Sequence, residues 1–198
     1  SHDNQTLYVA EQSPDGAVIA LDPQTLSERW RVNLSEWIEH SPLPAGDLYG
    51  AYTLPAAYGL ELLPDGSLFV VATHAWNDSK GIRQNRALVL NIGQNGNILR
   101  KWPDTPMDAV LFRPRMRSGF ALIPSSKSSP GVARKDAPIG GTIVFDLTTF
   151  QPKTAIEIPP LKPWFQRSFV WEAVDLVDEH VFAGLSDGRA GLWDLESR

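Results

Sequence analysis

Short apolar runs rich in β-branched residues follow one another along the chain, and no segment shows the three-to-four-residue period of an amphipathic helix. The runs are interrupted at short intervals by turn-forming residues, which include 15 glycines and 16 prolines. Runs of this length, bounded by Gly, Pro, Asp and Asn, are typical of β-strands. The pattern therefore predicts an all-β protein.

One pattern of two apolar runs recurs four times. The first run ends in Asp or Asn, a short polar turn follows, and a second run comes next. A short Asp or Asn side chain accepts hydrogen bonds from nearby backbone N–H groups, so it favours a tight turn. The copies are residues 20–34, 89–102, 144–158 and 192–198, with Asp22, Asn91, Asp146 and Asp194 at the aligned position.

Further apolar runs precede these copies. One lies directly upstream of every copy, and a second lies upstream of the last three; they are residues 6–11, 67–75, 118–124 and 180–186, and residues 58–63, 108–113 and 170–177. A complete repeat therefore has four strands, a to d in chain order. Four antiparallel strands per repeat are typical of the blades of a β-propeller, and we expect that fold.

We expect a single partial-propeller domain over residues 1–198, with about 14 strands, or about three and a half blades. Its blades are predicted at residues 5–34 (strands b to d), 57–103, 108–159 and 170–198 (strands a to c). This count leaves a strand edge without a partner at each end. We therefore expect a larger propeller of about six to eight blades, completed by another chain or by further blades.

Two segments resemble known propeller repeats. GLSDGRAGLWDLESR (residues 184–198) is similar to the hairpin between strands b and c of WD40 repeats. YGLELLPDGSLFVVA (residues 58–72) resembles the a–b hairpin shared by the WD40, YVTN and quinoprotein-amine-dehydrogenase-like propellers. The resemblance implies a propeller fold over most of the chain and leaves the subfamily open, since Trp193-Asp194 is the only Trp-Asp pair.

In such a blade the a–b and c–d turns leave the sheet at one end, and the b–c and d–a connections leave at the other, because successive strands are antiparallel. The second end, called the long-loop face, is predicted to carry long connections at residues 35–55, 76–85, 125–141 and 159–169. Loops above about 12 residues are commonly binding segments. The alternative is that they are variable solvent loops.

The side chains expected on the long-loop face are aromatic and basic. This mixture is common at protein interfaces, and it also binds small anions by stacking and charge-assisted hydrogen bonds. The candidate binding residues are Trp37, Tyr49, Tyr52, Trp76, Arg83, Arg134, Lys135, Trp164 and Arg167. Each of these tryptophans is alternatively a packing residue, and we interpret Trp30, Trp102, Trp171 and Trp193, on or next to strands, as core.

Charge is uneven along this chain of net charge −5. Residues 1–66 hold 10 acidic and 2 basic residues, residues 67–167 hold 6 and 14, and residues 168–198 hold 7 and 2. A basic middle attracts anionic partners, although an ordinary solvated surface shows the same imbalance. The acidic total argues against a nucleic-acid-binding domain. No apolar run approaches the roughly 18 residues of a membrane span.

The sequence lacks an H-E-x-x-H pair, a P-loop and any cysteine. His40, His74 and Asp78 are residue types that bind divalent metals, but no ligand spacing favours a metal site over ordinary surface groups. We assign no catalytic residue and expect no cofactor. Three N-x-S/T sequons, at Asn4, Asn33 and Asn77, favour a secreted, periplasmic or luminal location.

These features favour a non-catalytic recognition module that binds a protein partner or a small anionic ligand through the long-loop face. The alternative is an enzyme or enzyme subunit, which the resemblance to quinoprotein-like and lactonase-like propellers implies. Its site would lie at the mouth of the central channel, near His40, Glu61 and His74. Fold alone does not decide between the two functions.

Overall fold

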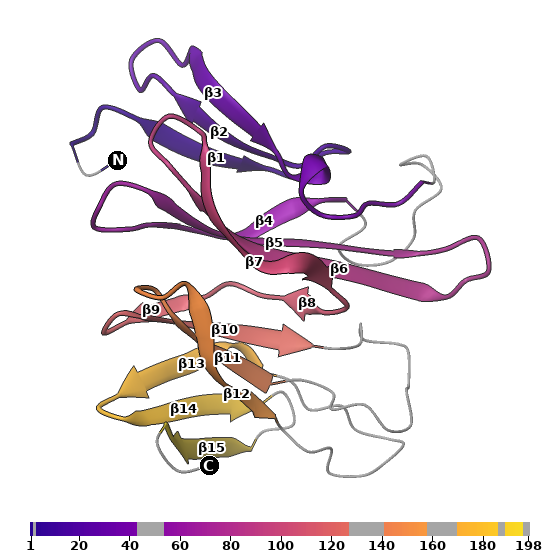
Figure 1. Ribbon diagram of the computed structural model, residues 1–198, viewed down its shortest axis with the longest axis vertical. Helices are drawn as coiled ribbons and strands as arrows, with labels where there is room; N and C mark the ends of the chain where they lie inside the picture. The colour runs from indigo at the N-terminus through magenta and orange to yellow at the C-terminus, as the bar shows by residue number, and fades with distance from the viewer. Residues whose placement is uncertain (2, 43–53, 127–140, 158–169, 186–188, 196–198) are drawn as a thin grey trace. The chain divides into compact units, whose positions relative to one another are not determined.

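The computed structural model describes residues 1, 3–42, 54–126, 141–157, 170–185 and 189–195. In these residues the strands form four antiparallel sheets, accompanied by one 3₁₀ turn, η1 (Leu34–Glu36) (Figure 1). The prediction of an all-β protein built from four-stranded antiparallel sheets is confirmed. The chain divides into two compact units, residues 1–108 and 109–198, and the expectation of a single domain stays a prediction.

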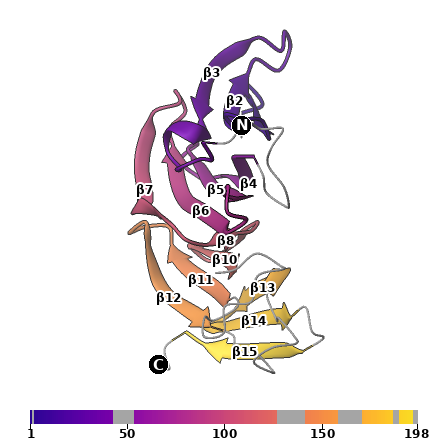
Figure 2. The ribbon, with the colours of Figure 1, turned by 90° about the vertical axis from the view of Figure 1, so that its right-hand side faces the viewer.

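Unit 1 (residues 1–108) contains the first and second sheets (Figure 2). The first sheet has the strand order β1-β2-β3 and the second has the order β4-β5-β6-β7, so strands adjacent in sequence are hydrogen-bonded neighbours. Their bounds are β1 (Leu7–Glu11), β2 (Ala17–Leu21), β3 (Glu28–Asn33), β4 (Ala56–Leu62), β5 (Leu68–Asn77), β6 (Arg83–Ile92) and β7 (Ile98–Met107).

The core of unit 1 lies between its two sheets. Successive side chains of a strand point to opposite faces, so one face of the first sheet meets every second residue of β5 and β6. Partly buried rings of Tyr8, Trp30 and Trp37 pack against this cluster. The buried members of the cluster are Val18, Val32, Leu34, Ile38, Leu68, Val70, Ala72, Leu88, Leu90 and Ile92.

Unit 2 (residues 109–198) contains the third and fourth sheets. The third has the order β12-β11-β10-β8, with β9 also paired to β10, and the fourth has the order β13-β14-β15. Leu122 and Val144 of the third sheet pack against Val174, Val181 and Ala183 of the fourth. The strands are β8 (Val110–Leu111), β9 (Arg115–Arg117), β10 (Phe120–Ser126), β11 (Gly141–Asp146), β12 (Gln151–Glu157), β13 (Val170–Val177), β14 (His180–Leu185) and β15 (Ala190–Asp194).

The first strand of the third sheet differs from its prediction. The sequence predicted a continuous strand over residues 108–113 and a turn over residues 114–118, whereas β8 and β9 pair with opposite halves of β10. The turn is only Ser118-Gly119, with φ of 48° and 83°, which matches a two-residue hairpin turn. Pro114 has no N–H to donate, so the strand breaks there and resumes at Arg115.

Two of the aligned acidic residues begin turns as expected. Asp22 Oδ1 accepts hydrogen bonds from the N–H groups two and three residues on, both at 3.0 Å, and Asp146 Oδ1 does the same at 2.7 and 3.2 Å. The last residue of each turn, Leu26 or Phe150, lies at positive φ and donates its N–H to the Asp carbonyl at 2.9 Å. The two turns therefore share one backbone conformation.

Asn91, which was expected to begin a turn in the same way, does not. Its buried side chain donates from Nδ2 to Ser67 Oγ at 2.8 Å and to the Leu68 carbonyl at 3.2 Å. The turn begins later, at Gly93, whose N–H donates to the Asn97 carbonyl. The prediction was wrong here because an amide, unlike a carboxylate, also donates hydrogen bonds and thereby ties β6 to the start of β5.

We expect Leu90→Ala to lower the free energy of unfolding by about 2–5 kcal/mol, because it removes a fully buried side chain from between two sheets. The matched control is Leu99→Ala on β7, where the leucine is exposed and the change should stay below about 0.5 kcal/mol. Urea denaturation followed by tryptophan fluorescence measures both. Equal losses in the two variants would contradict the assigned core.

Stability should also fall in acid. The pKa of Asp22 is held below its ordinary value of 3.8 by the Thr25 N–H and then by the Arg29 guanidinium, and the Ser67 hydroxyl lowers the pKa of Asp65. A lowered pKa stabilises the native state only while the carboxylate is ionised, so the contribution is complete above about pH 5 and is lost as pH falls through the folded-state value. The urea concentration at the unfolding midpoint should therefore decrease when the pH is lowered below about 4. Asp22→Asn should make the urea midpoint depend less on pH. An unchanged pH dependence in the variant would contradict this role of Asp22.

Candidate functional site

The turns of unit 1 gather at two ends, as expected for this topology. The end opposite the long-loop face, where the a–b and c–d turns lie, is called the short-turn end. There, Gln94 Nε2 donates to the Asp65 carbonyl at 3.0 Å, and Trp30 Nε1 donates to the Gln94 carbonyl at 2.7 Å. At the long-loop end, the Leu34 N–H donates to the Gly16 carbonyl at 2.6 Å. The connection that follows β3 thus starts beside the β1–β2 turn.

The most prominent described feature of that face is the end of the β5–β6 hairpin, residues 74–86, called the β5–β6 arm. β4 pairs with β5 only as far as Thr73, and β7 pairs with β6 only as far as Ala87. β5 and β6 continue to pair with each other up to Asn77 and Arg83. Figure 1 shows the arm extending beyond β4.

The prediction of a loop over residues 76–85 is wrong, because only residues 78–82 form the turn. The polar residues Asn77, Gln84 and Asn85 gave the segment the composition of a loop. Backbone pairing between β5 and β6 does not depend on side-chain type, so polar side chains are compatible with it. The alternation of Ala75 with its polar neighbours was too short a signal to predict the extension.

The tip of the arm is a turn organised by Asp78. Its Oδ1 accepts the N–H groups of Lys80 and Ile82, both at 2.9 Å, and Oδ2 accepts Gln84 Nε2 at 3.2 Å. The Ile82 N–H bond is the main cause of the lowered pKa of Asp78. Gly81 supplies the positive φ of 73° that the turn requires, and the Ile82 side chain is 52% exposed at the tip.

The base of the arm is a stack of three side chains. Arg86 lies over the Trp76 ring at 5.8 Å, and Trp76 stacks on His74 with ring centroids 4.5 Å apart. His74 Nε2 accepts the Ser41 N–H at 3.1 Å, and Arg86 Nε donates to Glu39. The stack therefore anchors the segment that follows η1 to the arm, and it buries Trp76 and His74.

The structure describes few of the candidate binding residues. Trp37 is half-buried against the core of unit 1 and Trp76 is buried, which favours the packing role for both. Arg83 lies on β6. The others, Tyr49, Tyr52, Arg134, Lys135, Trp164 and Arg167, lie outside the described residues.

The three residues considered as metal ligands do not lie together in a metal-binding arrangement. His40 is exposed, His74 is buried in the stack, and the Asp78 carboxylate accepts the hydrogen bonds of its own turn. Within the described ranges, no group of three or more His, Cys, Asp or Glu side chains is placed to hold a metal ion. The structure thus offers no geometric support there for the metal hypothesis.

A polar cavity of about 460 Å³ lies at the short-turn end of unit 1. It is lined by the residues before β1, by Tyr8 and Arg29 of the first sheet, and by the turns at Asp65 and Gln94. Arg29 is already paired with Asp22 at 2.7 Å. Sequence analysis missed this cavity because its walls come from distant segments at the end that was expected to carry only short turns.

An ion pair in unit 2 joins the third and fourth sheets. Arg117 Nε lies 2.8 Å from Asp175 Oδ1 and Arg115 lies 3.8 Å from the same carboxylate, and Arg117 lowers the pKa of Asp175. All three side chains are at least one-third exposed, so the pair adds little stability. Its role is to position β13 beside β9.

Comparison with known proteins identifies the fold. No family model matches the chain, and no curated protein matches its sequence. The crystal structure of BamB from Moraxella catarrhalis is similar to 97% of this chain, with 14% identity and a TM-score of 0.54, and the match covers 47% of that chain. The computationally designed Ika4 protein is 16% identical over 94% of this chain and 84% of its own, with a TM-score of 0.47.

BamB is a β-propeller, so the likeness confirms the predicted fold class. This chain spans about half the length of the BamB chain, and WD40 or YVTN membership stays a prediction. In the part of the chain that the structure describes, no helix is long and apolar enough to cross a bilayer.

Trp76→Ala tests whether Trp76 packs the arm or lies on a surface. We expect the free energy of unfolding to fall by about 3 kcal/mol, since a buried indole leaves a cavity between Arg86 and His74. Hydrogen exchange at the Ser41 amide should accelerate, because the His74 ring that accepts its hydrogen bond loses its support. Unchanged stability and exchange would show that Trp76 is a surface residue.

Proposed function

We propose that this chain is part of a non-catalytic β-propeller recognition module that binds a protein partner through its long-loop face, with the β5–β6 arm as part of the contact surface. The observation that carries the proposal is the arm itself. It extends past both neighbouring strands and presents an exposed isoleucine at its tip.

The arm is organised before any partner binds. The Asp78 turn holds the tip, and the stack of Arg86, Trp76 and His74 holds the base. A contact surface ordered in advance loses little conformational entropy on binding, so more of the interaction energy contributes to affinity. An apolar residue on such a support is a suitable anchor for a protein interface.

A protein partner fits this surface better than a small anion. Small molecules bind in concave pockets that enclose most of their surface, whereas the arm tip is a projecting turn. The described cation at the arm base, Arg86, is already paired with Glu39.

The enzyme alternative gains no support from the described residues. The site of such an enzyme was expected near His40, Glu61 and His74. His74 is buried against Trp76 and accepts the Ser41 N–H, so it is not open to a substrate in this arrangement. His40 is exposed and Glu61 is half-buried, and neither belongs to the stack. We therefore retain recognition as the proposed function.

Ile82→Glu tests the proposal, and Leu26→Glu is its matched control. Both residues are large, apolar and exposed, at 52% and 62%, and Leu26 lies in the β2–β3 turn at the opposite end of unit 1. A photo-cross-linking amino acid placed at Lys80 would capture the partner in the cells that produce the protein. With that partner purified, Ile82→Glu should raise the Kd about tenfold or more, and Leu26→Glu should leave it unchanged. Equal affinity for the wild-type chain and both variants would contradict the proposed surface.

A further inference from the structure

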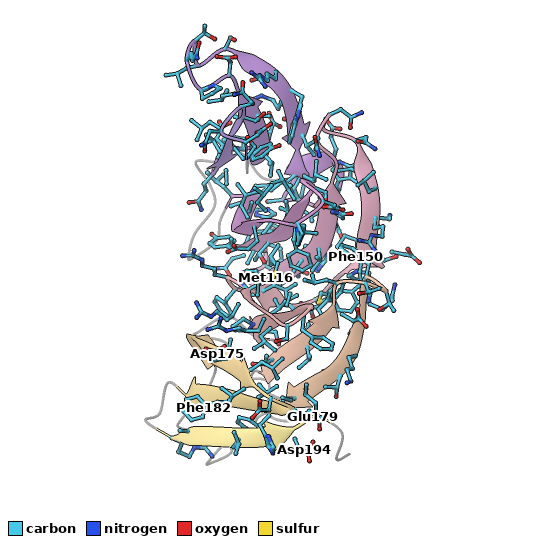
Figure 3. The ribbon with its side chains drawn as sticks, turned by 90° about the vertical axis from the view of Figure 1, so that its left-hand side faces the viewer. Met116, Phe150, Asp175, Glu179, Phe182 and Asp194 are labelled. Atoms are coloured by element: carbon cyan, nitrogen blue, oxygen red, sulfur yellow. The ribbon has the colours of Figure 1, made fainter. Side chains whose placement is uncertain are left out.

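The fourth sheet has one buried and one bare face. Val174, Leu176, Val181 and Ala183 point toward the third sheet and are buried in the core of unit 2. The opposite face, called the far face of the fourth sheet, carries Val177, Phe182 and Leu192, which are 61%, 47% and 64% exposed. Phe182, which is labelled in Figure 3, is the direct cross-strand partner of Leu192, and Val177 lies on the same face of β13.

The first sheet also has an apolar face turned away from its neighbour. Leu7 pairs with Leu21 and Val9 pairs with Ile19 across β1 and β2, on the side opposite Val18. These four residues lie on the far face of the first sheet, where Leu7 is 43% exposed, Val9 and Leu21 are half-buried and Ile19 is buried. Both far faces thus present apolar side chains that no other sheet of their own unit covers.

When the repeats are aligned, each far face corresponds to a sheet face that a neighbouring sheet covers elsewhere in the chain. The two far faces correspond to the two opposite sides of that sheet-on-sheet contact. Leu192 stands two residues before Asp194, as Val144 stands two before Asp146, and Val144 is one of the residues of the third sheet that pack on the fourth. Leu21 stands one residue before Asp22, as Leu90 stands one before Asn91, and Leu90 receives the first sheet in unit 1. Ile19 and Leu88 each stand three residues before the aligned Asp22 or Asn91, so they align in the same way.

We propose that the far face of the fourth sheet of one copy binds the far face of the first sheet of a second copy of this chain. The contact would repeat the sheet-on-sheet packing that both units already contain. The match covers 47% of the BamB chain, so a propeller of that size has room for two segments as long as this one. These surfaces are sheet faces, so the proposal is independent of the long-loop face.

Two of the charged groups on these faces already have partners. Arg31, opposite Ile19 on β3, is paired with Glu11 at 2.8 Å and with Glu28 at 3.1 Å. Asp175, the cross-strand neighbour of Phe182, is paired with Arg117. Because these groups already have partners of opposite charge in their own unit, covering them leaves no lone charge among them.

The first experiment measures the mass of the full chain in solution by light scattering, from about 1 to 100 µM. We expect a species of twice the chain mass of 21.9 kDa at the upper concentrations. Phe182→Glu and Leu7→Glu should each convert it to the monomer mass, and Leu99→Glu, an exposed leucine on β7, should not. Circular dichroism of each variant verifies that the chain remains folded.

The second experiment uses the absence of cysteine from the chain. Leu192→Cys and Leu7→Cys are prepared separately, and a short bis-maleimide is added to each and to their mixture. The mixture should give a cross-linked pair of chains, because the contact joins different faces, and neither variant alone should do so. These mild substitutions keep the proposal testable even if a glutamate variant unfolds.

Several results would overturn the proposal. A monomer at 100 µM would exclude the contact, and so would a dimer sensitive to Phe182→Glu but not to Leu7→Glu. Efficient cross-linking of Leu192→Cys with itself would instead place the same face on both sides. Assemblies larger than two copies that show the mixed cross-link would support the contact, because a head-to-tail contact that does not close extends into a chain.

Discussion

The packing of one antiparallel sheet on the next is the interaction on which the rest of the structure depends. In unit 1, alternate residues of β2 and β3 meet alternate residues of β5 and β6, and in unit 2 the third and fourth sheets repeat this arrangement. Burial of apolar area is the main driving force for such a core. It also leaves the two ends of each sheet as the places for turns and connections, because one face of the sheet is covered by its neighbour.

Polar side chains contribute by organising those ends rather than by holding the sheets together. Carboxylates at Asp22, Asp65, Asp78 and Asp146 accept backbone N–H groups within their own turns, which satisfies donors that no strand can reach. At the long-loop end the same device shapes the tip of the β5–β6 arm. At the base of the arm, where β4 and β7 no longer pair with β5 and β6, Trp76 stacks on His74 and lies beneath Arg86.

The strand pattern could be predicted because each strand is encoded within a few neighbouring residues. The turns at Asp22 and Asp146 were predictable for the same reason, since the carboxylate and its N–H donors lie within three residues of each other. Asn91 was not, because its partners lie more than twenty residues away on β5. The pairing of β9 and the extension of β5 and β6 were missed likewise, since each depends on a neighbouring strand supplying backbone partners.

The sequence by itself determined that this protein is all β, that its strands come in repeated antiparallel groups, and where most turns begin, because alternation and turn chemistry are local properties. Only the tertiary structure decided which aromatic side chains are buried and which apolar residues remain uncovered. Both Trp76 and Phe182 are aromatic residues on strands. Trp76 is buried in a stack, whereas Phe182 lies on a bare sheet face. That difference arises from which sheets and segments pack against each strand, and no local pattern contains it.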